Sequence, residues 1–358
     1  FFVEIAKFSR EKEEKMRRVL ATVLVLSFNL AACGNSTGDV KSAEKGPDSV
    51  KENTEASVKT IQLGHGQTEA HPYHLGAVKF AELVDQYTDG QIKVEIFPNA
   101  TLGAERDMVE GVSMGSVDAC ITTNAPLTNF NSNFNVFEFP YLFENVEDVH
   151  KVLDGEFGQN LMDELGNIGI KGLAYFENGF RNVTNSKREI LTVEDLAGLK
   201  IRTMESEVHI AAFKAMGANP TPMNWGEVYT AIQQGTIDGQ ENPAMAILDG
   251  KIFEVNKYLS LTEHFYSPAE LLINADLFQS LTTQQQEAVQ RAAQEACIYE
   301  REQAFAFNRD KLQTLSDNGM KVTEVDKTSF KEACQKVYEQ YSDEYGTQIA
   351  EIQALLAD

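Results

Sequence analysis

"TTQQQEAVQRAAQEACIYEREQAFAFNRDKLQTLSD", residues 282–317, is the stretch that decides the fold. Apolar side chains recur near every third or fourth position, and neither glycine nor proline interrupts the run. This pattern predicts one continuous α-helix. At 1.5 Å per residue the helix would be roughly 50 Å long, which exceeds the width of most single domains of this size. We therefore expect it to brace two lobes.

The segments before this helix alternate between two patterns. Short apolar or alternating runs bounded by turn residues predict strands at 58–65, 91–98, 117–123, 170–177 and 198–203. Apolar side chains at three- and four-residue spacing predict helices at 73–88, 104–115, 206–216 and 225–235. A βαβ rhythm of this kind predicts an α/β fold with largely parallel sheets.

The N-terminal region has the layout of a signal peptide. Residues 1–15 precede Met16 and are set aside as a leader. After Met16 come a short basic region, the apolar run "VLATVLVLSFNL" and then "LAAC", which ends at Cys33. The apolar run is too short to span a bilayer as a permanent helix. Because "LAAC" resembles the bacterial lipobox, we expect residues 1–32 to be removed and Cys33 to be acylated.

The segment behind this cysteine predicts a tether. Residues 33–57 are polar and lack large apolar side chains, so they cannot pack into a core. We therefore expect an exported domain on a flexible leash. It would be lipid-anchored to the cell membrane and face the periplasm or the cell exterior.

The charge balance limits the partners. The chain carries 31 basic and 54 acidic residues, a formal net charge of −23, and removal of 1–32 would leave 25 against 50. Nucleic acid is disfavoured, since binding it needs a basic surface. Anionic small ligands remain possible only where a local arginine cluster overrides the acidic field. Besides Cys33, three cysteines remain; an oxidising compartment would allow a Cys297–Cys334 bridge, but their spacing does not require one.

Two enzyme patterns occur, and the context of each argues against it. "GVSMG" (111–115) matches a nucleophile elbow around Ser113, but it closes a helix, whereas the elbow follows a strand and opens a helix. "GHGQTE" (64–69) begins like a dinucleotide fingerprint, yet Glu69 occupies the place of the third glycine and would repel a pyrophosphate. We expect neither an enzyme nor a cofactor; an exported serine hydrolase is the weaker alternative function.

Three of the six histidines, His65, His71 and His74, lie close together beside Glu69. Imidazole and carboxylate groups at this spacing are potential zinc ligands, so a metal-capture lipoprotein is an alternative function. The structural alternative is a strand-to-helix loop with Pro72 at the first helical position and His71 at the cap. We predict no metal site.

Arg181 and Arg202 lie about twenty residues apart, each at the edge of a predicted strand. Arginine holds carboxylates well because its planar fork donates two parallel hydrogen bonds and stays charged when buried. Nearby glycines permit tight turns at these strand edges, where ligands of α/β folds bind. The alternative is a pair of surface arginines bonded to local glutamates. We interpret the pair as a carboxylate clamp.

Two motifs carry a family resemblance: "GFRNVTNSKREILTVEDLAGLKIRT" (179–203) and "GANPTPMNWGEVYTAIQQGTIDGQENP" (217–243). From about residue 58 to its end, the chain resembles the DctP-type solute-binding proteins of TRAP (tripartite ATP-independent periplasmic) transporters. The resemblance implies a two-lobed clamp of the periplasmic-binding-protein kind, with crossing strands and a long helix bridging both lobes. It also implies capture of an organic acid for the membrane subunits of a TRAP transporter.

The expected domains follow from this resemblance. We expect lobe 1 at 58–178 plus approximately 268–307, and lobe 2 at 179–267 plus approximately 308–340. A C-terminal helix is expected at 341–358.

The resemblance also assigns site residues in the second lobe. Arg202 in "GLKIRT" matches the family's main carboxylate-binding arginine, and Arg181 in "GFRNVTN" matches a second arginine near the ligand. Asn242 in "GQENP" matches an asparagine that bonds the same carboxylate, and Trp225 in "MNWGEVY" matches an aromatic position at the pocket.

The first lobe departs from one branch of the family. After "VDACITT" the chain reads "NAPLTNF", whereas some sialic-acid-binding relatives have Glu and Arg there, which argues against sialic acid. First-lobe contacts are expected from Gln67, His71, Thr123 and Asn124. A pocket rich in neutral hydrogen-bonding groups favours a sugar acid such as a uronate over a C4-dicarboxylate.

Overall fold

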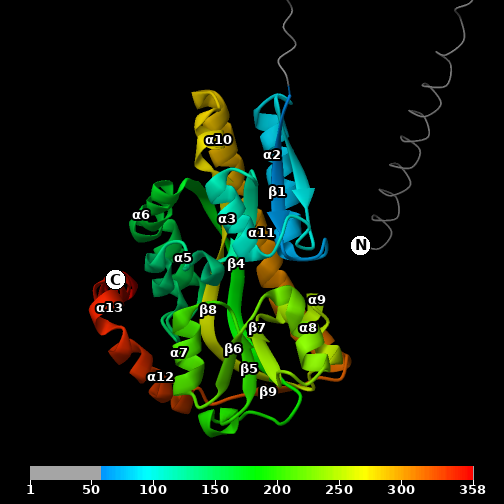
Figure 1. Ribbon diagram of the computed structural model, residues 1–358, viewed down its shortest axis with the longest axis vertical. Helices are drawn as coiled ribbons and strands as arrows, with labels where there is room; N and C mark the ends of the chain where they lie inside the picture. The colour runs from blue at the N-terminus through cyan, green and yellow to red at the C-terminus, as the bar shows by residue number, and fades with distance from the viewer. Residues whose placement is uncertain (1–57, 358) are drawn as a thin grey trace, which may run out of the picture. The chain divides into compact units, whose positions relative to one another are not determined.

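The computed structural model describes residues 58–357 (Figure 1). The predicted leader, signal peptide, Cys33 and tether lie outside the described residues. Within 58–357, none of the helices combines the length and the apolar character needed to cross a bilayer.

A nine-stranded mixed sheet forms the centre of the described fold. Its strands are β1 (Lys59–His65), β2 (Ile92–Phe97), β3 (Ala119–Thr123), β4 (Ile170–Asn185), β5 (Lys200–Thr203), β6 (Asn219–Pro222), β7 (Gly239–Asn242), β8 (Tyr258–Asn274) and β9 (Lys321–Glu324). The order is β2-β1-β3-β8-β4-β7-β5-β6, with β9 paired to β8.

The prediction of largely parallel sheets is correct at the two ends of the sheet and wrong at its centre. The β1–β2, β1–β3, β5–β6 and β5–β7 pairs are parallel, and so is the pairing of β9 with the N-terminal end of β8. The β3–β8, β4–β8 and β4–β7 pairs are antiparallel. The sequence predicted only the apolar first half of β4, because the second half buries polar side chains that do not read as a strand.

Strands β4 and β8 connect the two halves of the sheet. β8 pairs with β3 near its C-terminal end and with β9 near its N-terminal end, while the end of β4 pairs with β7. Register shifts interrupt the β4–β8 ladder at Gly172/Ala174, at Glu177/Gly179 and at Arg181/Val183. Gly179 has φ +105°, a backbone conformation that glycine tolerates best. The lobe boundaries expected at 178/179 and 267/268 lie opposite each other here, since Gly179 pairs with Ser267.

The helices cover both faces of this sheet (Figure 1). The α-helices are α2 (Pro72–Tyr87), α3 (Glu105–Met114), α4 (Asn124–Leu127), α5 (Val146–Asp154), α6 (Glu156–Glu164), α7 (Glu207–Ala215), α8 (Trp225–Gln233), α9 (Ala244–Asp249), α10 (Ala275–Gln279), α11 (Thr283–Asp317), α12 (Thr328–Gln340) and α13 (Ser342–Ala357). Four 3₁₀ helices are η1 (Ser132–Glu138), η2 (Leu165–Ile168), η3 (Val193–Leu196) and η4 (Ile252–Glu254).

Helix α11 confirms the predicted brace. Thr282 caps its start by accepting a hydrogen bond from the Gln285 amide, and its 35 residues end at Asp317. Its N-terminal half packs through small side chains such as Ala292 into the core under α2 and β1. Its C-terminal end places Leu315 in a separate core with α8 and α9. One helix therefore contacts both halves of the fold.

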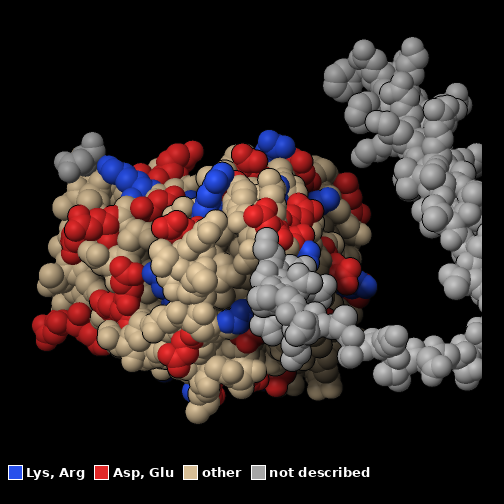
Figure 2. All heavy atoms as spheres, turned by 90° about the horizontal axis from the view of Figure 1, so that it is seen from above, with Lys and Arg blue, Asp and Glu red and all other residues tan. Residues whose placement is uncertain are grey.

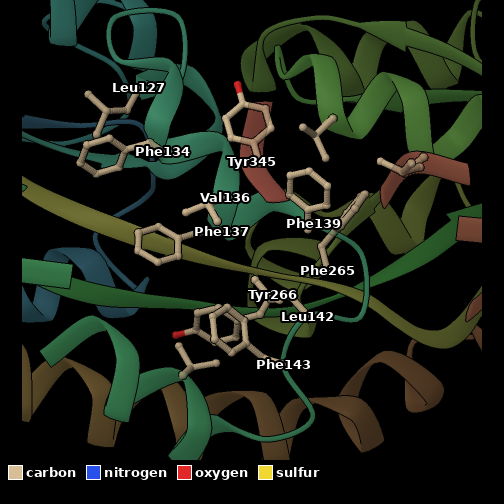
Figure 3. Close-up of a cluster of buried hydrophobic side chains, with 14 of the residues drawn as sticks. Leu127, Phe134, Val136, Phe137, Phe139, Leu142, Phe143, Phe265, Tyr266 and Tyr345 are labelled. Carbon is tan, nitrogen blue, oxygen red and sulfur yellow. The ribbon is translucent and has the colours of Figure 1, made fainter. Parts of the chain in front are cut away.

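The largest core joins segments that are distant in sequence (Figure 3). Phe134 and Phe137 of η1 pack edge-on, and Phe137 also meets Tyr175 of β4 with ring centroids 5.9 Å apart. Tyr345 of α13 packs against Phe139, which follows η1. This core fixes α4 and η1 beside the ends of the parallel strands.

Candidate functional site

A cavity of about 430 Å³ lies where the C-terminal ends of parallel strands from both halves of the sheet converge. Its first wall follows β1 and β2 and includes the starts of α3 and α4, and its second wall follows β5 and β6. Ligands of α/β folds bind at such strand ends. The lining residues are Gly66, Gln67, Asn99, Ala100, Ala104, Glu105, Pro126, Arg202, Met204, Glu205, Met223, Asn224, Trp225, Gly226 and Glu227.

Arg202, near the end of β5, supplies the cavity's cation. Its Nε donates to the Met223 carbonyl at 2.8 Å, and its guanidinium carbon lies 5.9 Å from the centroid of the Trp225 ring. No other hydrogen bond of this side chain occurs within 58–357. Burial lowers the pKa of Arg202 to about 10, so the group stays charged at neutral pH. Its terminal nitrogens remain available for a bidentate anion.

Trp225 is the first residue of α8 and supports this arginine. Its ring packs so closely against Gly250 that a Cβ added there would lie 2.4 Å from the indole. The contact holds the ring in place beside Arg202, where its face favours a positive charge.

The other charged groups of the lining are the carboxyls of Glu105, Glu205 and Glu227. Glu105 begins α3 and accepts from the Thr123 amide at 3.1 Å and from the Thr123 hydroxyl at 2.8 Å. Burial raises the pKa of Glu105 above its ordinary value, and the two bonds from Thr123 oppose that rise. The lining therefore combines one cation with several hydrogen-bond acceptors.

The loop after β2 holds two strained residues in the lining. Asn99 and Ala100 have φ +58° and +55°, which is unusual for a non-glycine pair and costs of order 1–3 kcal/mol each. Their amides donate to the carbonyls of Gln67 and His65, at 2.9 and 3.0 Å. The loop after β1 thus fixes the loop after β2 against the cavity.

Three of the predicted site residues line the cavity: Arg202, Trp225 and Gln67. Thr123 does not line the cavity, but its backbone amide and its hydroxyl donate to Glu105, which does. Asn124 is buried, and its side-chain Nδ2 donates to the Phe134 carbonyl and to Glu138 Oε1. Its Oδ1 has no partner among the described residues.

Arg181 is buried and bonds a glutamate that the sequence did not indicate. Its Nε and Nη2 donate to the two carboxylate oxygens of Glu241 at 2.6 and 2.8 Å, while Nη1 has no partner within 58–357. Burial would raise the pKa of Glu241, but Arg181 and His264 hold it well below its usual range. Asn242, the next residue of β7, donates to Gln240. Neither Arg181 nor Asn242 belongs to the cavity lining described above.

The three clustered histidines take structural roles. His71 is the N-cap of α2, with its Nδ1 accepting from the Tyr73 amide and Pro72 in the first turn, which confirms the loop-and-cap alternative. His65 Nε2 lies 3.1 Å from His74 Nδ1. Within 58–357, no group of three or more His, Cys, Asp or Glu side chains is arranged to hold a metal ion.

Ser113 and the cysteines also lie outside any reactive arrangement. The Ser113 hydroxyl donates to the Ile168 carbonyl at 2.6 Å from within α3, which confirms that it is a helix residue. Cys120, Cys297 and Cys334 are buried and unpaired, so the Cys297–Cys334 bridge does not form.

The sequence did not indicate the acidic lining or the strained loop. Glu105 follows the turn after β2, and Glu205 follows β5 by two residues. Both residues come shortly after a predicted strand, and this placement is the signal that would have indicated them as site residues. In a chain with 54 acidic residues, single carboxyls carry little signal in the sequence, whereas the few cations stand out.

Comparison with known proteins identifies the family. The model of the DctP family, bacterial extracellular solute-binding protein family 7, matches residues 63–344. The 2,3-diketo-L-gulonate-binding periplasmic protein YiaO of Escherichia coli (strain K12) is 38% identical over 278 residues, which are 77% of this chain and 85% of that protein.

Solved structures agree with this match. A TRAP periplasmic solute-binding protein from Polaromonas sp. JS666, bound to D-erythronate, is 39% identical with a TM-score of 0.81, covering 84% of this chain and 98% of that one. A second, from Sulfitobacter sp. NAS-14.1 with bound β-D-galacturonate, is 32% identical with a TM-score of 0.80, covering 83% and 99%. These relatives are two-lobed binding proteins and not enzymes. The chain, with its cavity between two halves of one sheet, belongs to the DctP family of extracytoplasmic TRAP solute-binding proteins.

Proposed function

We propose that the chain captures a hydroxylated sugar acid, with Arg202 holding the ligand's carboxylate. The free fork of Arg202 at the cavity wall supports this assignment, because its terminal nitrogens are its only unused donors. Arg181, whose Nη1 has no partner within 58–357, would add a second donor, and Asn242 would bond the same carboxylate. The acid would pass to the membrane subunits of a TRAP transporter.

The acidic lining favours a sugar acid over a C4-dicarboxylate. Arg202 is the sole Lys or Arg among the lining residues, and Glu105, Glu205 and Glu227 share the wall with it. A second ligand carboxylate would meet these carboxyls and be repelled, whereas ligand hydroxyls would donate to them. Relatives that are 38%, 39% and 32% identical bind diketogulonate, D-erythronate and β-D-galacturonate, whereas two relatives that are 31% identical bind C4-dicarboxylates or succinate.

Substitution of Arg202 tests the clamp. Arg202→Ala should weaken binding of the preferred acid by at least thirtyfold, because losing the partner of a buried charge costs about 2–5 kcal/mol. Arg202→Lys should also fail, since an ammonium does not reproduce the fork. Calorimetry with D-galacturonate, L-galactonate and succinate measures this, and Arg309→Ala, at an exposed arginine of α11, is the control. If Arg202→Ala binds the acid within threefold of the wild-type affinity, Arg202 does not hold the ligand's carboxylate.

We also propose that Cys33 carries a lipid anchor. The signal-peptide pattern before it supports this, and the cysteine lies outside the described residues. Incorporation of labelled fatty acid in a bacterial host should be lost in Cys33→Ser, and labelling that survives the substitution would disprove the anchor.

A further inference from the structure

Two side chains outside the cavity join the two halves of the fold at its rim. Thr68 lies in the loop between β1 and α2, and Asp249 is the last residue of α9, which packs with α8 in the other half. The Thr68 hydroxyl donates to Asp249 Oδ1, and the Thr68 amide donates to Asp249 Oδ2 at 3.2 Å. Neither residue belongs to the cavity lining.

Each partner is directly connected to the wall of the cavity. Thr68 follows Gln67, a lining residue. Asp249 precedes Gly250, which packs against the ring of Trp225, another lining residue. A movement that separates the two walls therefore has to break the Thr68–Asp249 pair.

The placement of Asp249 indicates that this contact has a function. An acidic side chain in the last turn of a helix faces the negative end of the helix dipole and is unfavourable there. Two donors from Thr68, one of them a backbone amide, offset this cost only while the two halves are together. When they part, the carboxylate loses both partners.

A second rim contact is weaker. Arg106 Nη1 lies 3.4 Å from Glu205 Oε2, and the Arg106 side chain is 51% exposed. The Asn129 side-chain Nδ2 donates to the Glu205 backbone carbonyl at 2.9 Å. Exposed ion pairs at this distance contribute little, and the Asn129 bond goes to a neutral carbonyl, so the Thr68–Asp249 pair, whose acceptor is charged, is the stronger rim contact.

We infer that Thr68 and Asp249 form a latch that keeps the cavity closed and sets how fast a bound ligand leaves. The latch acts on release and not on recognition, since it does not contact the cavity. It stabilises the closed arrangement relative to the open one, and that difference in stability shifts the equilibrium between them. The part of this inference that concerns ligand release rests on the proposed function.

The release rate gives the first measurement. Asp249→Ala removes both acceptors and should speed release of D-galacturonate or L-galactonate at least tenfold, because even one hydrogen bond to a charged group contributes about that factor. Thr68→Val keeps the amide donor and should give a smaller increase. The double variant should release no faster than Asp249→Ala alone, because both substitutions remove one shared interaction. Glu69→Gln removes an exposed charge next to Thr68 and is the matched control, so it should leave the release rate unchanged. Arg106→Gln should change the release rate less than twofold.

Hydrogen exchange of the Thr68 amide in the ligand-free protein gives the deciding measurement. This amide should exchange faster in Asp249→Ala than in wild type or Glu69→Gln, because its acceptor is gone. If neither acid binds the wild type, the proposed ligand class fails, while faster exchange still supports the latch. Thr68 exchange in Asp249→Ala that matches wild type overturns the latch, whatever the release rates.

Discussion

At the scale of single residues, the start of α2 buries His71 in its neutral form. Burial, with the nearby His65, lowers the pKa of His71 to about 3 from an ordinary value near 6.5. A group with a depressed folded pKa contributes stability above its unfolded pKa and loses it as the pH falls below that value. The free energy of unfolding should therefore fall by about 2 kcal/mol between pH 7.5 and pH 5 because of His71.

His71→Asn should isolate this effect, because asparagine is a good N-cap that does not titrate. Between pH 7.5 and pH 5 the variant should gain about 2 kcal/mol of unfolding free energy relative to wild type, measured in urea at both pH values. The comparison needs both proteins, since burial raises the pKa of Glu270 and Glu300, whose stabilisation instead fades as the pH rises. Thr282→Asn, at the cap of α11, is the non-titrating control. If the difference in unfolding free energy between His71→Asn and wild type is the same at both pH values, His71 is not buried in its neutral form.

At the scale of elements, the sequence predicted those with an uninterrupted pattern. Helix α11 was predicted within a residue of its observed start, and strands β1, β2, β3 and β5 within two residues. The second half of β4 was missed because its buried polar side chains find partners only in the folded molecule, as Arg181 does in Glu241. Of the cavity, the sequence predicted Arg202, Trp225 and Gln67. The acidic wall forms from loops that converge only when the strands pair.

The contact between α2 and α11 depends on one glycine. A Cβ at Gly76 would lie 2.7 Å from Phe176 and 2.8 Å from the Glu300 side chain. Gly76→Ala should therefore destabilise the protein by about 1–3 kcal/mol through overpacking, despite the better helix propensity of alanine. Gly346→Ala in α13 is the matched control, since nothing lies within 4 Å of its added Cβ, and it should stabilise by about 0.5–1 kcal/mol. Equal urea midpoints for the two variants would mean that α2 does not approach α11 as described.

At the scale of the whole molecule, an acidic protein has to attract an anion. The formal net charge is −23, and acidic side chains outnumber basic ones on the face shown in Figure 2. The proposed ligand is therefore repelled at long range and is attracted only close to Arg202. Salt screens the first effect more than the second, since the Debye length falls from about 30 Å at 0.01 M to about 8 Å at 0.15 M, whereas a buried pair is screened little.

Association should therefore become faster with salt, which is the reverse of ordinary electrostatic steering. Raising sodium chloride from 10 to 150 mM should increase the association rate constant of D-galacturonate by roughly threefold, while the dissociation rate changes less. Trp225 is the only tryptophan of the chain and lines the cavity, so stopped-flow tryptophan fluorescence reports on the site directly. An association rate that falls with salt would mean that the field of Arg202 at the cavity mouth outweighs that of the acidic surface, and that capture is steered by the site itself.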